Sequence, residues 1–189
     1  MTTHHDVCAY RRDREWWQDA VVYQVYPRSF ADSTGDGIGD LPGILDRLDY
    51  LVDLGIDALW ISPFYTSPLR DGGYDVADYR DVDERLGTLA DIDRLIAACH
   101  ERGLRIIMDI VPNHSFGTDP MVRLYQDADG SVSEDNPWYN KTSTHAFSPG
   151  YDFNHEDPWT REFWKRVFDF WLDEFHIDGY RLDLSKGLT

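Results

Sequence analysis

The stretch "DALWIS", residues 57–62, decides the fold that we expect for this chain. Its centre is continuously apolar, which is typical of a strand in a parallel sheet that is covered on both faces. Segments that also have strand character occur three more times along the chain. These further predicted strands are residues 20–27, 104–111 and 177–184.

Helical patterns lie between the predicted strands. Residues 41–55, 88–103 and 158–175 each carry apolar side chains at helical spacing. Thr88 and Asp91 open the second of these segments as a capping box, with Asp in place of the usual Glu or Gln. Because strands and helices alternate, we expect an α/β fold with a parallel sheet and helices packed outside it.

Two connections are far longer than the few residues that usually join such elements. They are residues 62–87 and 112–157, and both leave the carboxyl end of a predicted strand. Active sites of barrels and open α/β sheets lie at that edge. We therefore expect both connections to carry function.

The composition excludes several classes of protein. The chain has 189 residues with 42% hydrophobic side chains, which is enough to bury a core. Its formal net charge of −17 repels phosphate backbones and anionic lipid, so we expect neither a nucleic acid nor a membrane partner. Two cysteines, Cys8 and Cys99, make no disulfide framework, and no segment resembles a signal peptide. These features predict a cytoplasmic protein.

Polar residues at the ends of the last two predicted strands are the candidates for chemistry. Asp109 lies inside the third strand and His114 just past it. Arg181 and Asp183 lie two residues apart in the fourth strand, so their side chains point to the same face. The arginine would hold the aspartate ionised and oriented, ready to act as a nucleophile or to stabilise a cation. A purely structural ion pair is the alternative interpretation.

The loop "DSTGDGIGD", residues 32–40, has the spacing of oxygen ligands for a hard cation. Gly43 occupies the position of the bidentate Glu of an EF-hand, and no helix leads into the loop, so it is not an EF-hand. We expect either a calcium site on the same loop geometry or merely a turn rich in Asp and Gly. The predicted ligands are Asp32, Thr34, Asp36, Asp40 and the carbonyl oxygen of Ile38.

Tyr74 and Asp75, in the connection after the second strand, offer an aromatic face beside a carboxylate. A sugar ring presents an apolar face for stacking and hydroxyl groups that need hydrogen-bond acceptors. The pair therefore favours carbohydrate binding, although such residues are also common in ordinary loops.

Four blocks of the sequence, in order, resemble the α-amylase-type family of retaining glycoside hydrolases. They are "WWQDAVVYQVYPRSFADSTGDGIGDLPGI", "GIDALWISPFYTSPLRDGGYDVADYRDVDERLGT", "IIMDIVPNH" and "DGYRLDLSK". The first half is most similar to the oligo-1,6-glucosidase and α-glucosidase branch. The second half, with "SPGYDFNHEDP" and Lys186-Gly187 in place of Lys-His, is more similar to a bacterial α-amylase subgroup.

The resemblance implies an eight-stranded β/α barrel of TIM type, of which this chain has the first four strands. It implies that Asp183 is the nucleophile with Arg181 beside it, that Tyr74, Asp75 and His114 hold the sugar, and that Asp109 is a buried support. It also implies calcium in the 32–40 loop, where Thr34 stands in place of a more usual asparagine. The family's general acid, a Glu after strand five, has no counterpart, so we expect an N-terminal half that is inactive alone.

We divide the chain into residues 1–114 with strands one to three, an irregular insertion at 115–157, and residues 158–189 with the fourth strand. The predicted function is retaining hydrolysis of α-glucosidic bonds in oligo- or polysaccharides, completed by the missing C-terminal half-barrel. Two alternatives stay open. One is a non-catalytic half-barrel that binds carbohydrate or calcium and self-associates to cover its sheet edges. The other is a transglycosylating or isomerising relative such as a trehalose-forming enzyme.

Overall fold

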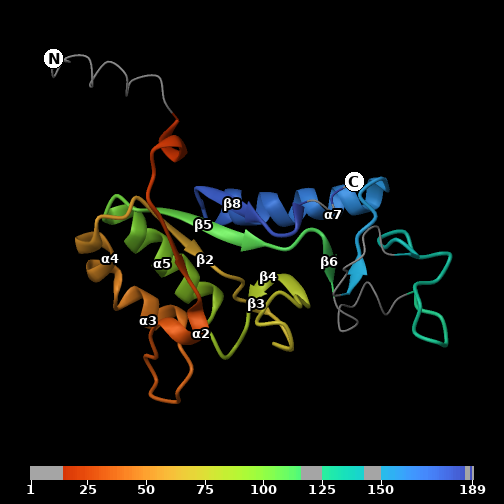
Figure 1. Cartoon of the computed structure of the whole chain (residues 1–189), viewed down its shortest axis with the longest axis horizontal. Helices are drawn as coiled ribbons and strands as arrows, with labels where there is room; N and C mark the ends of the chain where they lie inside the picture. The colour runs from red at the N-terminus through yellow and green to blue at the C-terminus, as the bar shows by residue number, and fades with distance from the viewer. Residues whose placement is uncertain (1–14, 116–124, 143–149, 186–187, 189) are drawn as a thin grey trace.

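The computed structural model describes residues 15–115, 125–142, 150–185 and 188. Its centre is a parallel sheet with the strand order β1-β2-β5-β8, drawn in Figure 1. These strands are β1 (Val22–Val25), β2 (Ala58–Ile61), β5 (Arg105–Ile110) and β8 (Gly179–Leu182). The structure confirms the predicted α/β fold, in which the four strands follow one another in space as they do in the sequence.

The two faces of this sheet differ in chemistry. Residues paired across parallel strands point to the same face, and each strand alternates between the faces. One face is apolar and fully packed, with side chains at most 1% exposed: Val25, Leu59, Ile61, Ile106, Met108 and Ile110. The other face carries Val22, Ala58 and Ile107 toward the amino ends of the strands and Gln24, Trp60, Asp109 and Arg181 toward their carboxyl ends. The polar face is the one that can hold a site.

The segment predicted as one helix, residues 41–55, is two helices, α3 (Leu41–Leu45) and α4 (Leu48–Leu54). The chain tightens at Arg47, whose amide donates to Ile44 three residues earlier at 3.0 Å, so the regular pattern of the α-helix stops there. Ile44 and Leu48 are nevertheless both fully buried. The spacing of apolar residues therefore predicted correctly that Ile44 and Leu48 are buried, but it did not predict the break between the two helices. A short helix, α2 (Pro27–Phe30), precedes the pair.

Helix α5 (Leu89–Glu101) begins with the predicted capping box. The Thr88 hydroxyl accepts a hydrogen bond from the Asp91 amide at 3.3 Å, and the Asp91 carboxylate accepts from the Thr88 amide at 2.8 Å. An aspartate therefore reaches back as the longer Glu or Gln usually does. The predicted stripe of this helix is buried, as shown by Ile92, Leu95, Ile96 and Cys99.

Helix α7 (Pro158–Asp169) continues as a π-helical turn, η2 (Phe170–Glu174), and packs beside β8. Aromatic side chains of α7 and η2 also pack against the first long connection. The ring of Trp164 lies 4.7 Å from that of Tyr79, centroid to centroid, and the Trp171 indole N–H donates to the Tyr79 carbonyl at 2.8 Å. A short 3-10 turn, η1 (Trp16–Gln18), lies before β1.

Both long connections contain strands of their own. The first forms an antiparallel hairpin of β3 (Tyr65–Thr66) and β4 (Asp78–Val82). The second pairs β6 (His114–Ser115) with β7 (Tyr151–Asp152), also antiparallel, and parts of it lie outside the described residues. Figure 1 shows these strands beyond the ends of β2 and β5. The three-part division of the chain stays a prediction.

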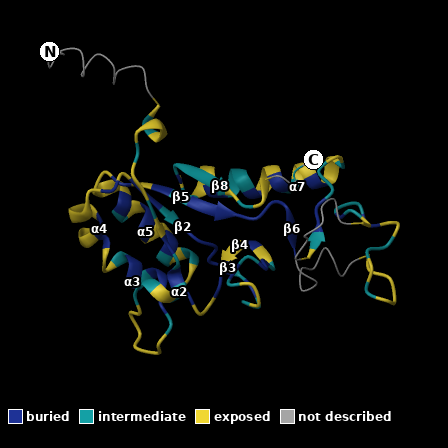
Figure 2. Cartoon of the chain, viewed as in Figure 1, coloured by how far each residue is buried: buried dark blue, intermediate teal, exposed yellow. Residues whose placement is uncertain are grey.

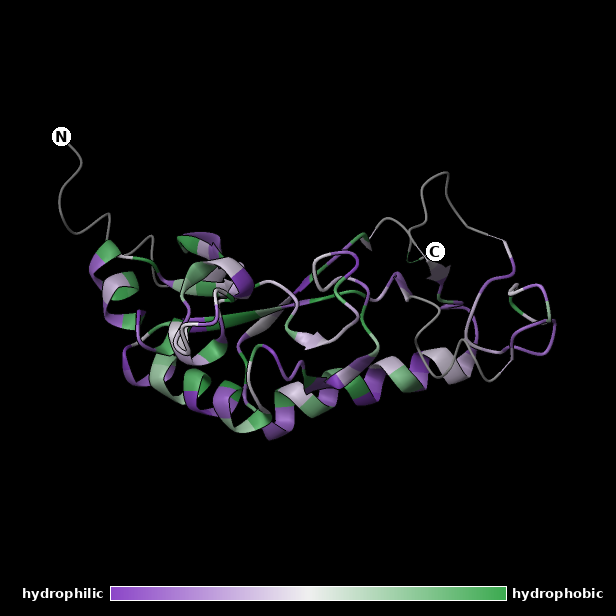
Figure 3. Ribbon diagram, turned by 90° about the horizontal axis from the view of Figure 1, so that it is seen from below, coloured by the Kyte–Doolittle hydropathy of each residue, from purple (hydrophilic) through white to green (hydrophobic). Residues whose placement is uncertain are grey.

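Burial and hydropathy follow this arrangement. Much of β5 is dark blue, that is buried, in Figure 2, whereas the outer sides of the helices are yellow. In Figure 3 the helices carry alternating hydrophobic and hydrophilic bands, as amphipathic helices on a sheet should. In the part of the chain that the structure describes, no helix combines the length and the apolar character needed to cross a membrane.

The capping box generates a stability prediction. Thr88→Ala removes the hydroxyl that caps α5, so we expect a loss of about 1 kcal/mol in the free energy of unfolding. Thr88→Ser keeps the hydroxyl and should lose much less. Urea unfolding of the two variants and the unchanged chain measures this, and equal losses for Ser and Ala would show that the cap contributes nothing.

Candidate active site

Asp109, inside β5, is the residue around which the polar face is organised. Its side chain is fully buried. The carboxylate accepts hydrogen bonds from the Trp60 indole N–H at 3.0 Å, from the Tyr74 hydroxyl at 3.0 Å and from Arg181 at 3.0 Å. The Tyr65 hydroxyl donates to its backbone carbonyl at 2.9 Å. One carboxylate thus joins β2, its following loop, β5 and β8.

Arg181 connects this buried carboxylate to the end of β8. Its Nη1 lies 3.0 Å from an oxygen of Asp109 and 2.6 Å from an oxygen of Asp183. The guanidinium also lies over the Trp60 ring, 5.0 Å from the centroid. Along this chain of contacts the side-chain exposure is 0% at Asp109, 37% at Arg181 and 14% at Asp183. Asp183 is therefore held from below and remains partly open to a ligand.

The position of Asp183 follows from the strand register. Asp109 and Arg181 are direct partners across β5 and β8, so they share a face. The Asp183 amide donates to the Ile110 carbonyl at 2.8 Å, which continues the ladder past the end of β8. Asp183 therefore lies on the polar face with Arg181, on the side opposite the buried apolar residues. The shared orientation predicted for Arg181 and Asp183 is what the geometry shows.

Burial and charge set the protonation of this group. Burial raises the pKa of Asp109 above its ordinary value, and the hydrogen bond and charge of Arg181 oppose that rise. For Arg181, burial disfavours the cation, but the bonds and charges of Asp109 and Asp183 outweigh it and raise its pKa. Burial and the charge of Asp109 raise the pKa of Tyr74, so its hydroxyl stays a donor. Arg181 and Tyr74 therefore both keep the protons that they donate to Asp109.

His114 follows β5 as predicted and is buried, with 1% of its surface exposed. Its Nδ1 lies 3.0 Å from the side-chain amide nitrogen of Asn113, and this contact orients the ring. The Tyr79 hydroxyl donates to the His114 carbonyl at 3.1 Å, which fixes the backbone. The sequence analysis did not assign a role to Asn113.

Asp71, in the connection after β2, brings the separate strand ends into one electrostatic group. Burial raises its pKa, the charges of Asp75 and Asp183 raise it further, and His114 lowers it. The hydrogen bonds of Tyr74 and Arg181 to Asp109 join the connection after β2 to β5 and β8. Sequence reasoning missed Asp71, although it lies three residues before Tyr74.

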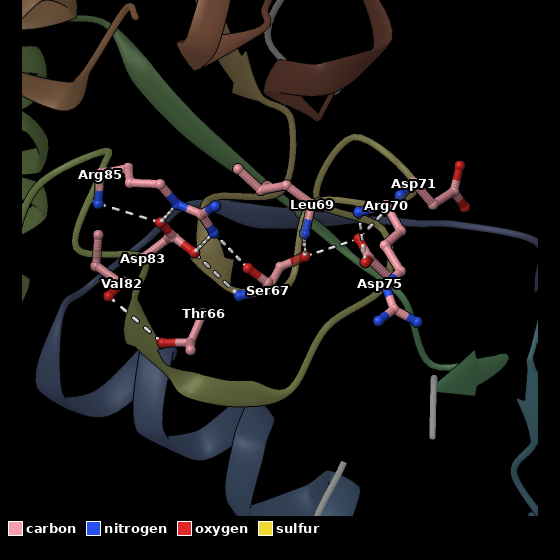
Figure 4. Close-up of polar contacts among 9 residues, drawn as sticks. All are labelled: Thr66, Ser67, Leu69, Arg70, Asp71, Asp75, Val82, Asp83 and Arg85. Carbon is pink, nitrogen blue, oxygen red and sulfur yellow. Dashed lines mark hydrogen bonds and ion pairs between the residues drawn. The ribbon is translucent and has the colours of Figure 1, made fainter. Parts of the chain in front are cut away.

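Asp75, predicted to contact the sugar, is instead bonded to residues of its own loop. It is fully buried, and Figure 4 shows its carboxylate inside the loop after β3. One oxygen accepts from the Ser67 hydroxyl at 2.7 Å and the other from the Arg70 amide at 2.8 Å. These contacts shape the loop that carries Asp71 and Tyr74. In this arrangement Asp75 positions its neighbours, and its predicted contact with sugar stays a prediction.

In the 32–40 loop the carboxylates of the predicted calcium ligands bond to backbone amides. The Asp32 carboxylate accepts from the amides of Thr34, Gly35 and Gly37 at 2.7 to 2.9 Å. Asp36 accepts from the amide of Ile38 at 2.8 Å. Asp40 caps α3 through the Gly43 amide at 2.6 Å. Among the described residues no three acidic, histidine or cysteine side chains gather around a point. The donors suit a hard cation, and the calcium site stays a prediction.

Trp60 is a second residue of the site that the sequence analysis missed. It belongs to the stretch that identifies β2, where an apolar strand hides its role. The signal was nevertheless present: Trp60 and Ser62 alternate with the buried Leu59 and Ile61, so they point to the opposite face. An indole N–H on that face can donate to a carboxylate of the neighbouring strand, and it does so to Asp109.

The fold and this group of residues define a β/α-barrel type of protein with a carboxylate and an arginine at the carboxyl end of its fourth strand. Residues 24–146 match the family described as "Alpha amylase, catalytic domain". The chain therefore belongs to the α-amylase catalytic-domain family.

Known members of this family are similar to the chain in sequence. The chain is 42% identical to an oligo-1,6-glucosidase of Heyndrickxia coagulans, over 93% of this chain and 37% of the relative. It is 41% identical to a trehalose-6-phosphate hydrolase of Escherichia coli, over 92% of this chain and 36% of the relative. The chain thus spans little more than a third of the length of these relatives.

Two solved structures are similar to this one. The trehalose-6-phosphate hydrolase of Bacillus licheniformis superimposes with a TM-score of 0.79 at 33% identity, over 93% of this chain and 37% of the other. The trehalulose synthase of Pseudomonas mesoacidophila does so with a TM-score of 0.78 at 37% identity, over 93% of this chain and 36% of the other. These matches confirm that the four-stranded sheet is the first part of a glycosidase-type barrel.

The raised pKa of Asp109 generates a pH prediction. Between the ordinary aspartate value of 3.8 and the raised one, the folded chain holds a proton that the unfolded chain releases. Stability therefore falls as the pH rises through this window. Asp109→Asn lacks this titration, so the stability of the unchanged chain relative to the variant should decline across the window.

Urea unfolding of both chains, from below the ordinary aspartate pKa up to neutral pH, measures this difference. Asp173→Asn, on the exposed side of η2, is the matched control and should track the unchanged chain. A difference that does not vary with pH would contradict the raised pKa of Asp109.

Proposed function

We propose that this chain supplies the nucleophile half of a retaining glycoside hydrolase acting on α-glucosidic bonds of oligo- or polysaccharides. The observation that carries this proposal is the Asp183 carboxylate at a strand end, 2.6 Å from the Arg181 guanidinium and 14% exposed. A carboxylate that is oriented and partly open to a ligand is what attack on a sugar carbon needs. Asp183 is the proposed nucleophile, and Arg181 and the buried Asp109 position it.

In the proposed reaction an oxygen of Asp183 attacks the anomeric carbon, forming a covalent glycosyl-enzyme as the bond to the leaving oxygen breaks. Arg181 contacts the Asp183 carboxylate at 2.6 Å and orients it. The Tyr74 hydroxyl and the His114 ring are proposed to hold the sugar hydroxyls, with Asp75 shaping the loop beneath them. Water then releases the sugar from Asp183 with retained configuration.

Protonation of the leaving oxygen needs a second carboxyl group roughly 5 Å from the nucleophile. Among the described residues, no glutamate follows a strand of the parallel sheet. We therefore propose that the acid comes from a segment that completes the barrel. The outer strands β1 and β8 are the edges on which such a segment would pair. Self-association of two chains through these edges is the alternative, and sedimentation of the isolated chain separates a dimer from a monomer.

The names of the relatives support the substrate class. Oligo-1,6-glucosidase, α-glucosidase and trehalose-6-phosphate hydrolase are names for enzymes that cleave bonds of α-linked glucose. The similarity to a trehalulose synthase favours a second candidate, in which the glucosyl group on Asp183 is transferred to a sugar hydroxyl rather than to water. Both candidates use the same covalent step.

A chimera tests the nucleophile. The C-terminal remainder of the Heyndrickxia coagulans oligo-1,6-glucosidase is joined to residues 1–189 and assayed with an aryl α-glucoside. Asp183→Asn should lower kcat by at least about a thousandfold, because the covalent step is lost. The exposed Asp173→Asn should leave kcat unchanged.

Rescue distinguishes a nucleophile from a structural aspartate. In Asp183→Gly, added azide should restore turnover and give the glucosyl azide of inverted configuration. A chimera that folds and turns over equally well with Asp183→Asn would overturn the assignment. The ratio of hydrolysis to transfer products then separates the two candidate functions.

We further propose calcium binding by the 32–40 loop, supported by the spacing of its oxygen donors and not by their present geometry. The Asp32 and Asp36 carboxylates keep lone pairs that can bind the ion beside their amide partners. Calcium should then raise the melting temperature of the chain, and magnesium should do so less. Asp32→Asn keeps the turn's acceptor but lowers the charge, so its response should be weaker. No shift with either ion would contradict the proposal.

We propose a cytoplasmic location as well. The support is the free, buried thiol of Cys99 together with a sequence that carries no disulfide framework. Fractionation of the native organism's cells, followed by detection of the chain in the cytosol or the medium, decides this.

A further inference from the structure

A hollow lies on the outside of α7 and shares no residue with the group around Asp109. Its volume is about 230 Å³. Helix α7 provides most of its wall, β4 one side and the second long connection the other. The residues that line it are Arg80, Trp138, Trp159, Glu162, Phe163, Arg166 and Val167.

Contacts between these three elements hold the hollow open. The Thr160 hydroxyl on α7 lies 3.4 Å from the Trp138 carbonyl, and the Asn154 amide donates to the same oxygen at 2.7 Å. The ring of Phe163 packs edge-on against that of Tyr79, the neighbour of Arg80, with centroids 6.1 Å apart. A hollow whose walls are joined in this way is present before a ligand arrives, which lowers the cost of binding.

The apolar part of the hollow is aromatic and exposed. Trp159 has 69% of its surface exposed, the highest value among the exposed large hydrophobic residues of the described chain. Trp138 and Phe163 are half-buried beside it. Leaving an indole in water forgoes the stabilisation that its burial would bring, so an exposed tryptophan at the rim of a hollow indicates a contact surface.

The polar part supplies both donors and acceptors. Arg166 Nε donates to a Glu162 oxygen at 2.9 Å, and these side chains are 71% and 49% exposed. The pair leaves further guanidinium N–H groups and a second carboxylate oxygen for a ligand. Arg80 adds donors from the opposite wall. Donors and acceptors around an aromatic face match a ring that has an apolar face and hydroxyl groups at its edge.

We propose that this hollow is a second carbohydrate-binding site, which takes one neutral hexose unit of a glucan chain. Its volume is below the range that holds drug-sized ligands and is suited to a single sugar ring. A polyanion is disfavoured because the chain has a net charge of −17. Trp159 stacks on the ring, and Arg80, Glu162 and Arg166 bind its hydroxyl groups. The site binds without catalysis and does not depend on the proposed role of Asp183.

The chain carries its own probes for this proposal. It has seven tryptophans, whose indole N–H groups give separate signals in a ¹H–¹⁵N spectrum. Trp159 and Trp138 report the hollow, Trp60 reports the strand-end site, and Trp17, 59% exposed, lies in neither. Single replacements assign each signal. Maltotriose should shift the Trp159 and Trp138 signals saturably and leave Trp17 unmoved.

Variants sharpen the test. Trp159→Ala should weaken maltotriose binding, followed by the Trp138 signal, by about tenfold, because the stacking face is lost. Trp159→Phe should keep most of the affinity, and Trp17→Ala should change nothing. Glu162→Gln should weaken binding without disturbing the fold, since that side chain is half exposed.

The experiment tests the two proposed sites separately. A shift of Trp60 alone would support the strand-end site and overturn the hollow, whereas shifts of Trp159 and Trp138 alone would support the hollow without the proposed function. Equal shifts of Trp17 and Trp159 would mean unspecific stacking on exposed indoles, and the proposal would fall.

Discussion

The ion pair of Asp109 and Arg181 is the interaction on which the rest of the site depends. Burying a carboxylate is costly unless a cation and hydrogen bonds accompany it, and Asp109 has 0% exposure. Arg181 supplies the cation from the neighbouring strand, and the Trp60 and Tyr74 donors supply the remaining bonds. Because the pair is formed across β5 and β8, it aligns these strands and places Asp183 at the end of the second one. The support of the site and its reactive group are thus one connected unit.

A sheet with two chemically different faces makes that unit possible. The apolar face packs against the helices, and this burial supplies stability. The opposite face carries polar side chains whose partners come from neighbouring strands and from the loops beyond them. The loop between β3 and β4 closes over this face because the Asp75 carboxylate and the Asp83–Arg85 pair, drawn in Figure 4, hold its turns. The site therefore consists of rigid strand residues covered by a loop with internal bonds.

Much of this could be predicted from the sequence, for identifiable physical reasons. The strands were recognisable as short apolar runs rich in β-branched and aromatic residues, and α5 because its cap and its stripe are local features. The helix at residues 41–55 was predicted as one because the buried positions keep their spacing across the break at Arg47. Nothing local identifies Trp60 as a donor to Asp109, or His100 as the partner of Asp178 at 2.8 Å, since those residues are far apart in the sequence.

The amino-acid sequence by itself determined the alternation of strands and helices, the parity that sends Arg181 and Asp183 to one face, and the family to which the chain belongs. Periodicity and spacing are local properties, so they survive without coordinates. Only the tertiary structure decided which partners those side chains have: that Trp60, Tyr74 and Arg181 donate to Asp109, that Asp75 is used inside its own loop, and that the carboxylates of the 32–40 loop bond to backbone amides. Such choices depend on the register between strands and on competition among nearby donors, which no single segment of the chain encodes.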